Sequence, residues 1–125
     1  MKGLTLDTGA LIAFERNDRR VVVLLARALQ RELTFAVPAG VVAQAWRDGR
    51  KQARLARVLG SSELTVEVLD DTRARAAGQL CGVAGTKDVI DASVVLCARR
   101  RDHAVVTSDP DDLRRLDAAI ELIEV

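Results

Sequence analysis

The chain has 125 residues, of which 49% are hydrophobic and 30% are charged, so it is long enough to bury the core of one globular domain. This composition excludes a disordered tail, a collagen and a small disulfide-stabilised scaffold. Lys and Arg number 19 against 18 Asp and Glu, for a formal charge of +1, and aromatic residues make up only 2%. The chain therefore lacks the rings on which single-strand binders stack bases, and any nucleic acid would be held through its phosphates.

Hydrophobic periodicity and turn residues divide the chain into alternating strands and helices. In chain order we expect a strand at residues 3–7, helices at 8–16 and 19–32, a strand at 33–38, helices at 39–49 and 50–60, a strand at 63–69, helices at 70–85 and 87–101, a strand at 104–107, a helix at 109–118 and a strand at 120–125. Gly60 is expected to end its helix with a positive φ.

Most of the connections between the predicted strands are too long for hairpins, which favours a mainly parallel sheet. The strand at 104–107 is almost purely apolar, as expected for a strand covered by helices on both sides. We therefore predict an α/β fold in three layers, α/β/α, with a five-stranded sheet in one domain over residues 1–125.

Several common kinds of site have no support in the sequence. No apolar run approaches the roughly 20 residues that cross a bilayer, and the N-terminus leads into a strand rather than a signal peptide, so we expect a cytoplasmic protein without a membrane partner. Cys81 and Cys97 lack zinc-binding spacing and are expected to be small buried residues. His103 is expected to be structural or exposed, and no Ser or Thr has a neighbouring base for a triad.

Aspartates follow two of the predicted strands, at the edge where parallel α/β sheets form their binding sites. Asp7 ends the first strand, and Asp109 follows the strand at 104–107. Asp88 and Asp91 lie three residues apart near the start of the helix at 87–101, and so on one face. Crowded carboxylates repel one another unless a cation neutralises them, and oxygen-only ligands suit Mg²⁺ or Mn²⁺ rather than zinc.

Helix capping is the alternative explanation of these aspartates, because each precedes or begins a predicted helix. Asp109, followed by Pro110 and with Asp112 three residues later, is the clearest case for capping alone. Asp91 fits capping least, because it lies in an apolar stretch where an unpaired charge is costly.

Three segments in this order and spacing resemble PIN-domain nucleases, especially the VapC-type toxins of toxin–antitoxin pairs: LDTGALIA at 6–13, VIDASVVLCARRR at 89–101 and VVTSDPDDL at 105–113. The resemblance covers essentially the whole chain and implies a PIN-like fold and an endoribonuclease that hydrolyses RNA with Mg²⁺ or Mn²⁺. It implies that the metal is held by Asp7, Asp91 and Asp109 with Asp88, and that Asp112, Thr8 and Ser108 lie beside the site. It also implies a cognate antitoxin, with a segment inserted near the acids, and a homodimer.

Gln44 departs from this family pattern, since VVAQAWR at 41–47 has an amide where family members commonly have a glutamate. An amide oxygen can hold a water, but it carries no charge and accepts no proton. We therefore expect Gln44 to position water and metal binding to be weaker. Glu15 is a candidate replacement for the missing acid, or an ordinary acid at a helix end.

Two other functions stay open on the sequence alone. The first is a PIN-like module that binds RNA or protein and has lost catalysis through Gln44. The second is a flavodoxin-like or receiver-like signalling domain, which also binds Mg²⁺ through acids after its first strand. The second is weakened because the chain lacks paired acids before a phosphorylatable aspartate and a lysine after the last strand.

Basic residues gather in the first half of the chain. Residues 16–57 hold 9 Arg and 1 Lys against 3 acids, a net +7, whereas residues 88–125 hold 5 Arg against 9 acids, a net −4. We expect one helical face to bind RNA phosphates through Arg47, Arg50, Arg54 and Arg57, with an ordinary solvated face as the alternative. The apolar side chains of the helix at 19–32 either complete the core or form a seam for a second copy or a partner's helix.

Overall fold

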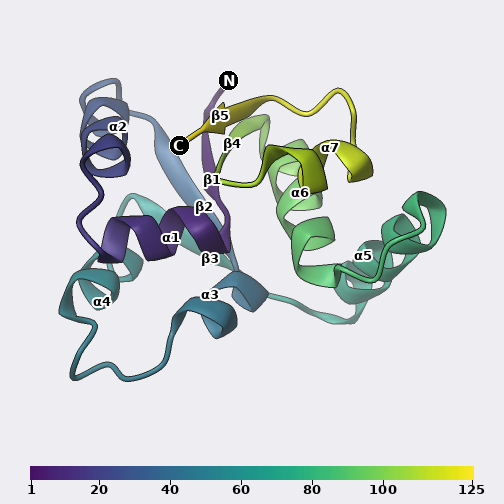
Figure 1. The fold of residues 1–125 in the computed structure, drawn as a ribbon, viewed down its shortest axis with the longest axis horizontal. Coiled ribbons are helices and arrows are strands. Elements are labelled where there is room, and N and C mark those ends of the chain that lie inside the picture. The colour runs from purple at the N-terminus through teal and green to yellow at the C-terminus, as the bar shows by residue number, and fades with distance from the viewer.

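The computed structural model describes residues 1–125 and confirms the predicted order of strands and helices (Figure 1). The strands are β1 (Gly3–Leu6), β2 (Thr34–Pro38), β3 (Leu64–Glu67), β4 (His103–Thr107) and β5 (Leu122–Glu124). The helices are α1 (Thr8–Glu15), α2 (Arg19–Gln30), α3 (Ala39–Ala45), α4 (Ala53–Leu59), α5 (Asp71–Ala84), α6 (Val89–Arg101) and α7 (Pro110–Leu116).

The five strands form one sheet in the order β3-β2-β1-β4-β5, and every neighbouring pair is parallel. The prediction of a mainly parallel α/β sheet is therefore confirmed, and here all pairs are parallel. From β1 the chain builds β2 and β3 on one side and then crosses over to β4 and β5 on the other. The strand order thus reverses between β1 and β4, and the carboxyl ends of these two strands are the place where open α/β sheets form binding sites.

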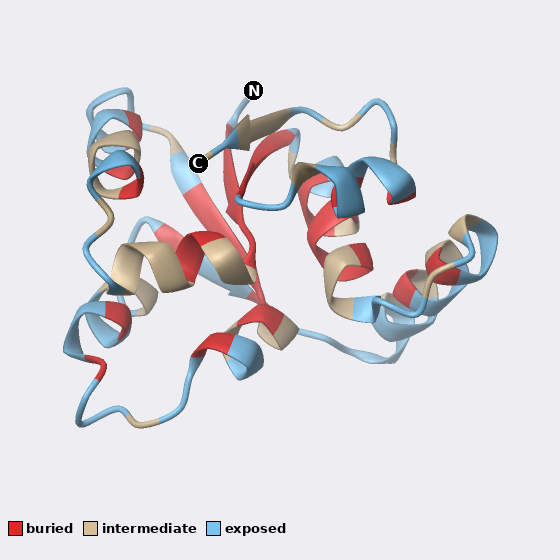
Figure 2. Cartoon of the chain, in the orientation of Figure 1, coloured by how far each residue is buried: buried red, intermediate tan, exposed pale blue.

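Helices cover both faces of the sheet. In Figure 1, α1, α2 and α4 lie on one side and α5, α6 and α7 on the other, with α3 at the lower edge where the two layers meet. The central strands β1 and β4 are buried along their whole length, and Figure 2 shows the buried residues concentrated there and on the sheet-facing sides of α1 and α6. The core of leucine, valine and alanine side chains therefore fixes these two helices, and Asp7, Asp88 and Asp91 lie at their N-terminal ends.

The helix predicted at 39–49 is wrong beyond Ala45, because α3 ends there and residues 46–52 form a loop. Gln52 organises this loop. Its Oε1 accepts the backbone N–H groups of Arg47 at 2.7 Å and Asp48 at 2.9 Å, and its Nε2 donates to the Ala45 carbonyl at 3.0 Å. These bonds satisfy backbone groups that a longer helix would have used, so the chain turns before α4.

The predicted positive φ at Gly60 is also wrong, since its φ is −88°. Gly85, with φ +73°, ends α5 in that conformation instead. On α2 the side chains of Val21 and Leu25 are buried in the core, whereas Leu29 is 42% exposed. Part of the apolar surface of α2 thus completes the core, and part stays accessible. No helix of the chain is both long and apolar enough to cross a membrane.

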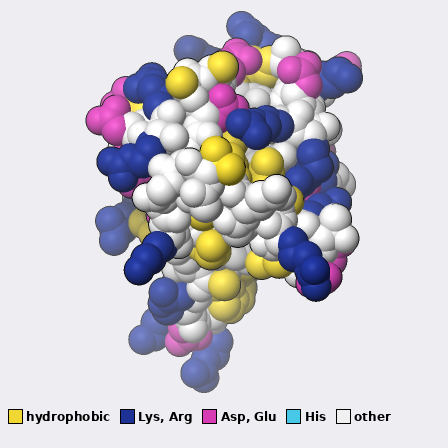
Figure 3. Space-filling model, turned by 90° about the vertical axis from the view of Figure 1, so that its right-hand side faces the viewer, with side chains coloured by type: hydrophobic (Ala, Val, Ile, Leu, Met, Phe, Trp, Pro, Cys, Tyr) yellow, Lys and Arg dark blue, Asp and Glu magenta, His cyan; other side chains and the backbone are white.

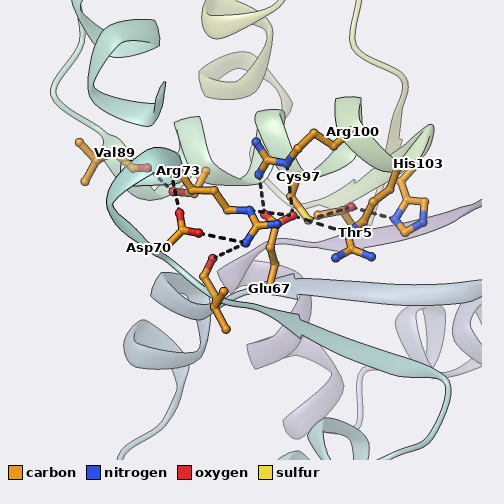
Figure 4. A network of polar contacts seen from close by, with 11 residues as sticks. Thr5, Glu67, Asp70, Arg73, Val89, Cys97, Arg100 and His103 are labelled. Carbon is orange, nitrogen blue, oxygen red and sulfur yellow. Dashed lines mark hydrogen bonds and ion pairs between the residues drawn. The ribbon is translucent and has the colours of Figure 1, made fainter. Parts of the chain in front are cut away.

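Glu67 is the buried polar centre of the α5–α6 side of the sheet, with only 5% of its side chain exposed (Figure 4). Its carboxylate lies 2.7 Å from Arg100 Nη2, 3.6 Å from Arg101 Nε and 3.8 Å from Arg73 Nε. This Glu67 network joins the edge strand β3 to α5 and to the C-terminal end of α6. It compensates a carboxylate that would otherwise be costly to bury.

The predicted structural residues lie where they were expected. Cys81 and Cys97 are buried and unpaired. His103 is buried at the start of β4, with Nδ1 3.1 Å from the hydroxyl of Thr5. Burial lowers the pKa of His103, and the nearby charge of Arg101 acts in the same direction. A neutral, hydrogen-bonded ring at the amino end of the sheet is consistent with a structural role.

Candidate functional site

Asp7 directly follows β1 and is only 6% exposed. Its Oδ1 accepts the backbone N–H of Ala10 at 2.8 Å, so the side chain caps α1. Burial raises the pKa of Asp7, and the charge of Asp109 raises it further. Hydrogen bonds from the Thr107 hydroxyl and from backbone N–H groups act in the opposite direction. Asp7 is therefore a buried carboxyl group held in one place by its cap and influenced by a second acid.

Asp88 and Asp91 stand at the start of α6. Asp88 Oδ1 accepts the backbone N–H of Asp91 at 2.9 Å, which makes Asp88 the cap of this helix. Burial, a hydrogen bond with the Asp88 carboxyl group and the charges of Asp88, Asp7 and Asp112 raise the pKa of Asp91 to about 7. Since these three acids come from different parts of the chain, the fold brings carboxyl groups of β1, α6 and α7 into one electrostatic site.

Asp109 precedes α7 but makes no capping hydrogen bond through its side chain, so the expectation that it is the clearest cap is wrong. Asp7 and Asp88 make such bonds instead. A hydrogen bond with the Asp112 carboxyl group raises the pKa of Asp109, and so do its partial burial and the Asp112 charge. Both acids are exposed.

Thr107 is a residue that the sequence reasoning missed. Its hydroxyl accepts the backbone N–H of Asp109 at 2.9 Å and hydrogen-bonds the Asp7 carboxyl group. Thr107 is fully buried at the end of β4, between the two strand-end acids. A hydroxyl at the carboxyl end of an otherwise apolar strand was the available signal.

Thr8, Gln44 and Ser108 border the acids. Thr8 Oγ1 donates to Gln44 Oε1, which ties the start of α1 to α3. A Cβ on Gly9 would collide with the Ser108 hydroxyl, so the first turn of α1 packs directly against the segment between β4 and α7. The structure thus brings both predicted hydroxyls and the predicted amide to the edge of the acidic site.

Gln44 also lines a cleft of about 480 Å³ that contains none of the aspartates, and we call it the basic cleft. It is lined by Ile12, Glu15, Arg16, Gln44, Ala45, Arg47, Lys51, Gln52 and Arg54. The predicted arginine face is wrong as a helical stripe, because Arg47 and Arg50 lie in the 46–52 loop and only Arg54 and Arg57 lie on α4. The cleft gathers Arg47 and Arg54 and leaves Arg50 and Arg57 outside its lining.

Arg16 and Lys51 are cleft residues that the sequence reasoning did not single out. Both belong to the basic first half of the chain, but helical spacing does not connect them to the arginines. Glu15, at the end of α1, lines the same cleft. It is not among the charges that act on Asp7 or Asp91, so it lies with the basic side chains rather than with the acids.

The donor set of the acidic site suits a hard divalent cation in its chemistry, because it consists of carboxylate, hydroxyl and amide oxygens without a His or Cys. Burial and the neighbouring carboxyl groups raise the pKa of Asp91, and a bound cation would relieve the repulsion among these groups. No three acidic, histidine or cysteine side chains are grouped closely enough to hold an ion as they stand. Binding would therefore require side chains to rotate inward, and Asp109 and Asp112 are the exposed members of the set.

A model of the PIN domain family matches residues 4–119. The chain belongs to the PIN domain family. PIN domains are generally nucleases, and the match covers the whole acidic site and the basic cleft. Comparison of this PIN domain with curated proteins gives no significant match.

Solved structures show the same fold at low sequence identity. The PIN domain is similar to a chain of VapBC2 from Rickettsia felis, bound to a DNA fragment from its promoter, with a TM-score of 0.70, 16% identity and 98% of both chains covered. It is similar to a chain of FitAB bound to the IR36 DNA fragment, with a TM-score of 0.66, 18% identity and coverage of 97% and 94%. A chain of FitAcB from Neisseria gonorrhoeae matches with a TM-score of 0.64, 18% identity and coverage of 97% and 96%.

Proposed function

We propose that this PIN domain is a toxin of the VapC type, an endoribonuclease that requires Mg²⁺ or Mn²⁺. The observation that carries the proposal is the convergence of acids on Asp91: burial first, and then the carboxyl groups of Asp88, Asp7 and Asp112, raise the pKa of Asp91 to about 7. None of these four acids forms an ion pair with a basic side chain, in contrast to Glu67, which has three arginines around it. Unpaired carboxyl groups with a raised pKa, located where the strand order reverses, are typical of a site for cationic or polar ligands.

Asp7, Asp91 and Asp109 would hold the cation, with Asp88 as a further ligand and Asp112 beside them. When bound, Mg²⁺ or Mn²⁺ would neutralise charge on the scissile phosphate and make water a better nucleophile. The protein's part is to keep Asp7 fixed by its bond to Ala10 and to present Asp91 in its ionised form. With a pKa of about 7, Asp91 loses its proton near neutral pH, which a cation would favour further.

The basic cleft would hold the RNA strand that leads to the acids. Acidic residues alone would repel a polyanion, and the four cations of the cleft would attract it. Gln44 lines this cleft and also accepts the Thr8 hydroxyl beside Asp7, so the two surfaces are continuous at this residue. Arg47 and Arg54 would contact phosphates within the cleft, whereas Arg50 and Arg57 lie outside its lining and would not.

Gln44 favours a second candidate function, a PIN domain that binds RNA or protein without cutting. Its side chain already accepts a hydrogen bond from Thr8 and carries no charge. The Gln44 amide would then position a water for attack only weakly. An RNA-binding domain of this kind would have the same fold, cleft and RNA ligand as the endoribonuclease. It would differ only in that it does not cut the RNA.

An antitoxin protein and a second copy of the chain are the proposed partners. Support comes from apolar side chains that stay exposed: Val83 is 84% exposed, Val68 is 61% exposed and Val89 is 49% exposed. Figure 3, which views the molecule from the α5 side, shows hydrophobic side chains among scattered basic ones on this face. Sedimentation of the purified chain, alone and with a co-expressed antitoxin, tests both partners.

The deciding experiment is cleavage of a labelled structured RNA by the purified chain with Mg²⁺, Mn²⁺ or EDTA, beside the variants Asp91→Asn and Gln44→Glu. Metal-dependent cutting that disappears in Asp91→Asn supports the nuclease. Equal cutting by Asp91→Asn and wild type overturns the metal-site assignment. Cutting by Gln44→Glu alone supports the module that has lost catalysis.

A further inference from the structure

We infer that Glu15 reads a base of the bound RNA. Its carboxylate would accept a hydrogen bond from an exocyclic amino group, so that cytosine, adenine or guanine is preferred over uracil at one position in the basic cleft. The inference rests on the proposed RNA ligand of the cleft and adds a determinant of sequence preference to it.

Glu15 is the only acid that lines the basic cleft, together with the four cations Arg16, Arg47, Lys51 and Arg54. The ion pairs of the chain all lie elsewhere, so neither Glu15 nor any of these cations is neutralised by a partner. Glu15 is half-buried at the end of α1 and is not simply a solvated surface acid. Its carboxylate oxygens are therefore free acceptors within a surface suited to a polyanion.

Three other polar side chains of the cleft already have partners. Gln52 uses both ends of its amide to hold the 46–52 loop. Gln44 Oε1 accepts the Thr8 hydroxyl. Arg47 donates through Nη1 to the carbonyls of Ala43 and Trp46, at 3.0 Å and 2.7 Å, which orients its guanidinium group. Glu15 is thus the side chain in the cleft that has its full capacity to accept hydrogen bonds from a ligand.

The chemistry of RNA decides what such an acceptor recognises. Phosphate oxygens have no proton to donate and are repelled by a carboxylate, so the backbone would follow the cations and avoid Glu15. Base edges with an amino group donate to carboxylates, as in the pairing of Glu with cytosine N4. Uracil has the O4 carbonyl oxygen where cytosine has its N4 amino group, and a carboxylate placed at that atom would be repelled.

The position of Glu15 separates this role from catalysis. It lies seven residues after Thr8 on α1, about 10 Å along the helix axis. Thr8 is next to Asp7, so Glu15 would meet a nucleotide near the acids and not the scissile phosphate itself. The readable position is therefore a flanking base.

The test is binding of short fluorescent RNAs that differ at a single base, measured by anisotropy in EDTA so that no cutting occurs. Wild type is expected to bind the best RNA with an amino-bearing base about tenfold more tightly than its uracil counterpart, which is within the range of one side-chain contact to a base. Glu15→Gln keeps the size of the side chain, and its amide both donates and accepts. We expect this variant to bind the two RNAs within about twofold of each other.

Glu121→Gln is the matched control, because it removes the same charge from an exposed residue outside the cleft. It should keep the base preference. Three results would overturn the inference. Glu15→Gln could keep the base preference, or wild type could bind all RNAs equally. Binding could also depend on the 2′-hydroxyl with no effect of the base. Tighter binding of every RNA by Glu15→Gln, without a change in preference, would show that Glu15 only repels phosphates. Cleavage is scored separately, so a chain that shows the preference without cutting contradicts the nuclease and leaves the role of Glu15 standing.

Discussion

The Asp88 carboxylate hydrogen-bonds the backbone of Asp91 and at the same time disfavours ionisation of the Asp91 side chain. The Asp88 carboxylate accepts the backbone N–H of Asp91 at 2.9 Å, which caps α6, and the same carboxylate raises the pKa of the Asp91 side chain. Capping and metal binding are therefore not exclusive explanations of these aspartates. A cap needs one carboxylate oxygen, and the second oxygen remains available to a ligand.

The pH dependence of stability should reveal the state of Asp91. Its pKa is about 7 in the folded chain against an ordinary value of 3.8, so between these values the folded form holds a proton that the unfolded form has released. The contribution of Asp91 to stability therefore falls as the pH rises from about 4 to 7. In EDTA, Asp91→Asn should equal wild type near pH 4 and exceed it at pH 8 by about 1–2 kcal/mol, allowing for partial exposure.

Thermal unfolding at the two pH values measures this difference. Asp71→Asn, which changes an acid that is 80% exposed and far along the chain from the site, is the control and should show no such crossover. An Asp91→Asn variant with the same offset at both pH values would contradict the raised pKa.

Divalent cations should stabilise the folded chain more at pH 8 than at pH 5.5. At the lower pH, Asp91 is protonated and a cation must compete with that proton. We expect Mn²⁺ to raise the Tm of wild type by several degrees at pH 8, by much less at pH 5.5, and to have little effect on Asp91→Asn. An equal rise in Asp91→Asn would place the cation elsewhere on the protein.

The sequence predicts the strands, and the positions of acids at their ends, because both depend on local patterns. β1 and β4 are apolar and buried on both sides, and parallel strands bring their carboxyl ends together, so Asp7 and Asp109 follow from the strand order. The basic cleft could not be predicted in this way. Its shape depends on Gln52, whose side chain holds a loop where helical periodicity appeared to continue.

Asp109 shows a second limit of local patterns. The segment from Asp109 to Asp112 has every feature of a helix start, and α7 does begin at Pro110. The Asp109 side chain is nevertheless drawn to Asp112 and leaves the backbone uncapped, while its own N–H is satisfied by Thr107. Which of several neighbouring polar groups becomes the hydrogen-bond partner of a side chain depends on the tertiary structure, and local sequence does not specify it.

Gln44→Glu should strengthen divalent cation binding. The added carboxylate would stand next to Thr8 at the border of the acidic site and increase its negative charge by one. We expect the Kd for Mn²⁺, measured by calorimetry at pH 8, to fall about tenfold. Gln44→Met, which has a similar size but neither charge nor an oxygen ligand, is the control and should not tighten binding. Unchanged affinity in Gln44→Glu would show that residue 44 is too far from the cation to matter.

The Glu67 network should be a main source of stability on the α5–α6 side (Figure 4). Glu67→Gln would leave Arg100 and Arg101 without a compensating charge and Arg73 with only its pair to the more exposed Asp70. Breaking buried pairs costs about 3–5 kcal/mol, and because these arginines are about a third exposed we expect about 2–3 kcal/mol here. Asp71→Asn, which breaks the exposed pair with Arg75, should cost about 0.5 kcal/mol or less. Urea unfolding compares the two, and equal losses would contradict the role of burial.

Arg54 and Arg57 offer a matched pair for testing the basic cleft. Both are exposed arginines on α4, and only Arg54 lines the cleft. If Arg54 contacts a phosphate, Arg54→Ala should weaken binding of every RNA to a similar degree and reduce the slope of log Kd against log salt by about 0.7. Arg57→Ala removes the same charge one turn away and should leave the slope nearly unchanged. Because the two variants have the same net charge, a general effect of charge would change both slopes alike, and that result would mean that RNA does not pass through the cleft.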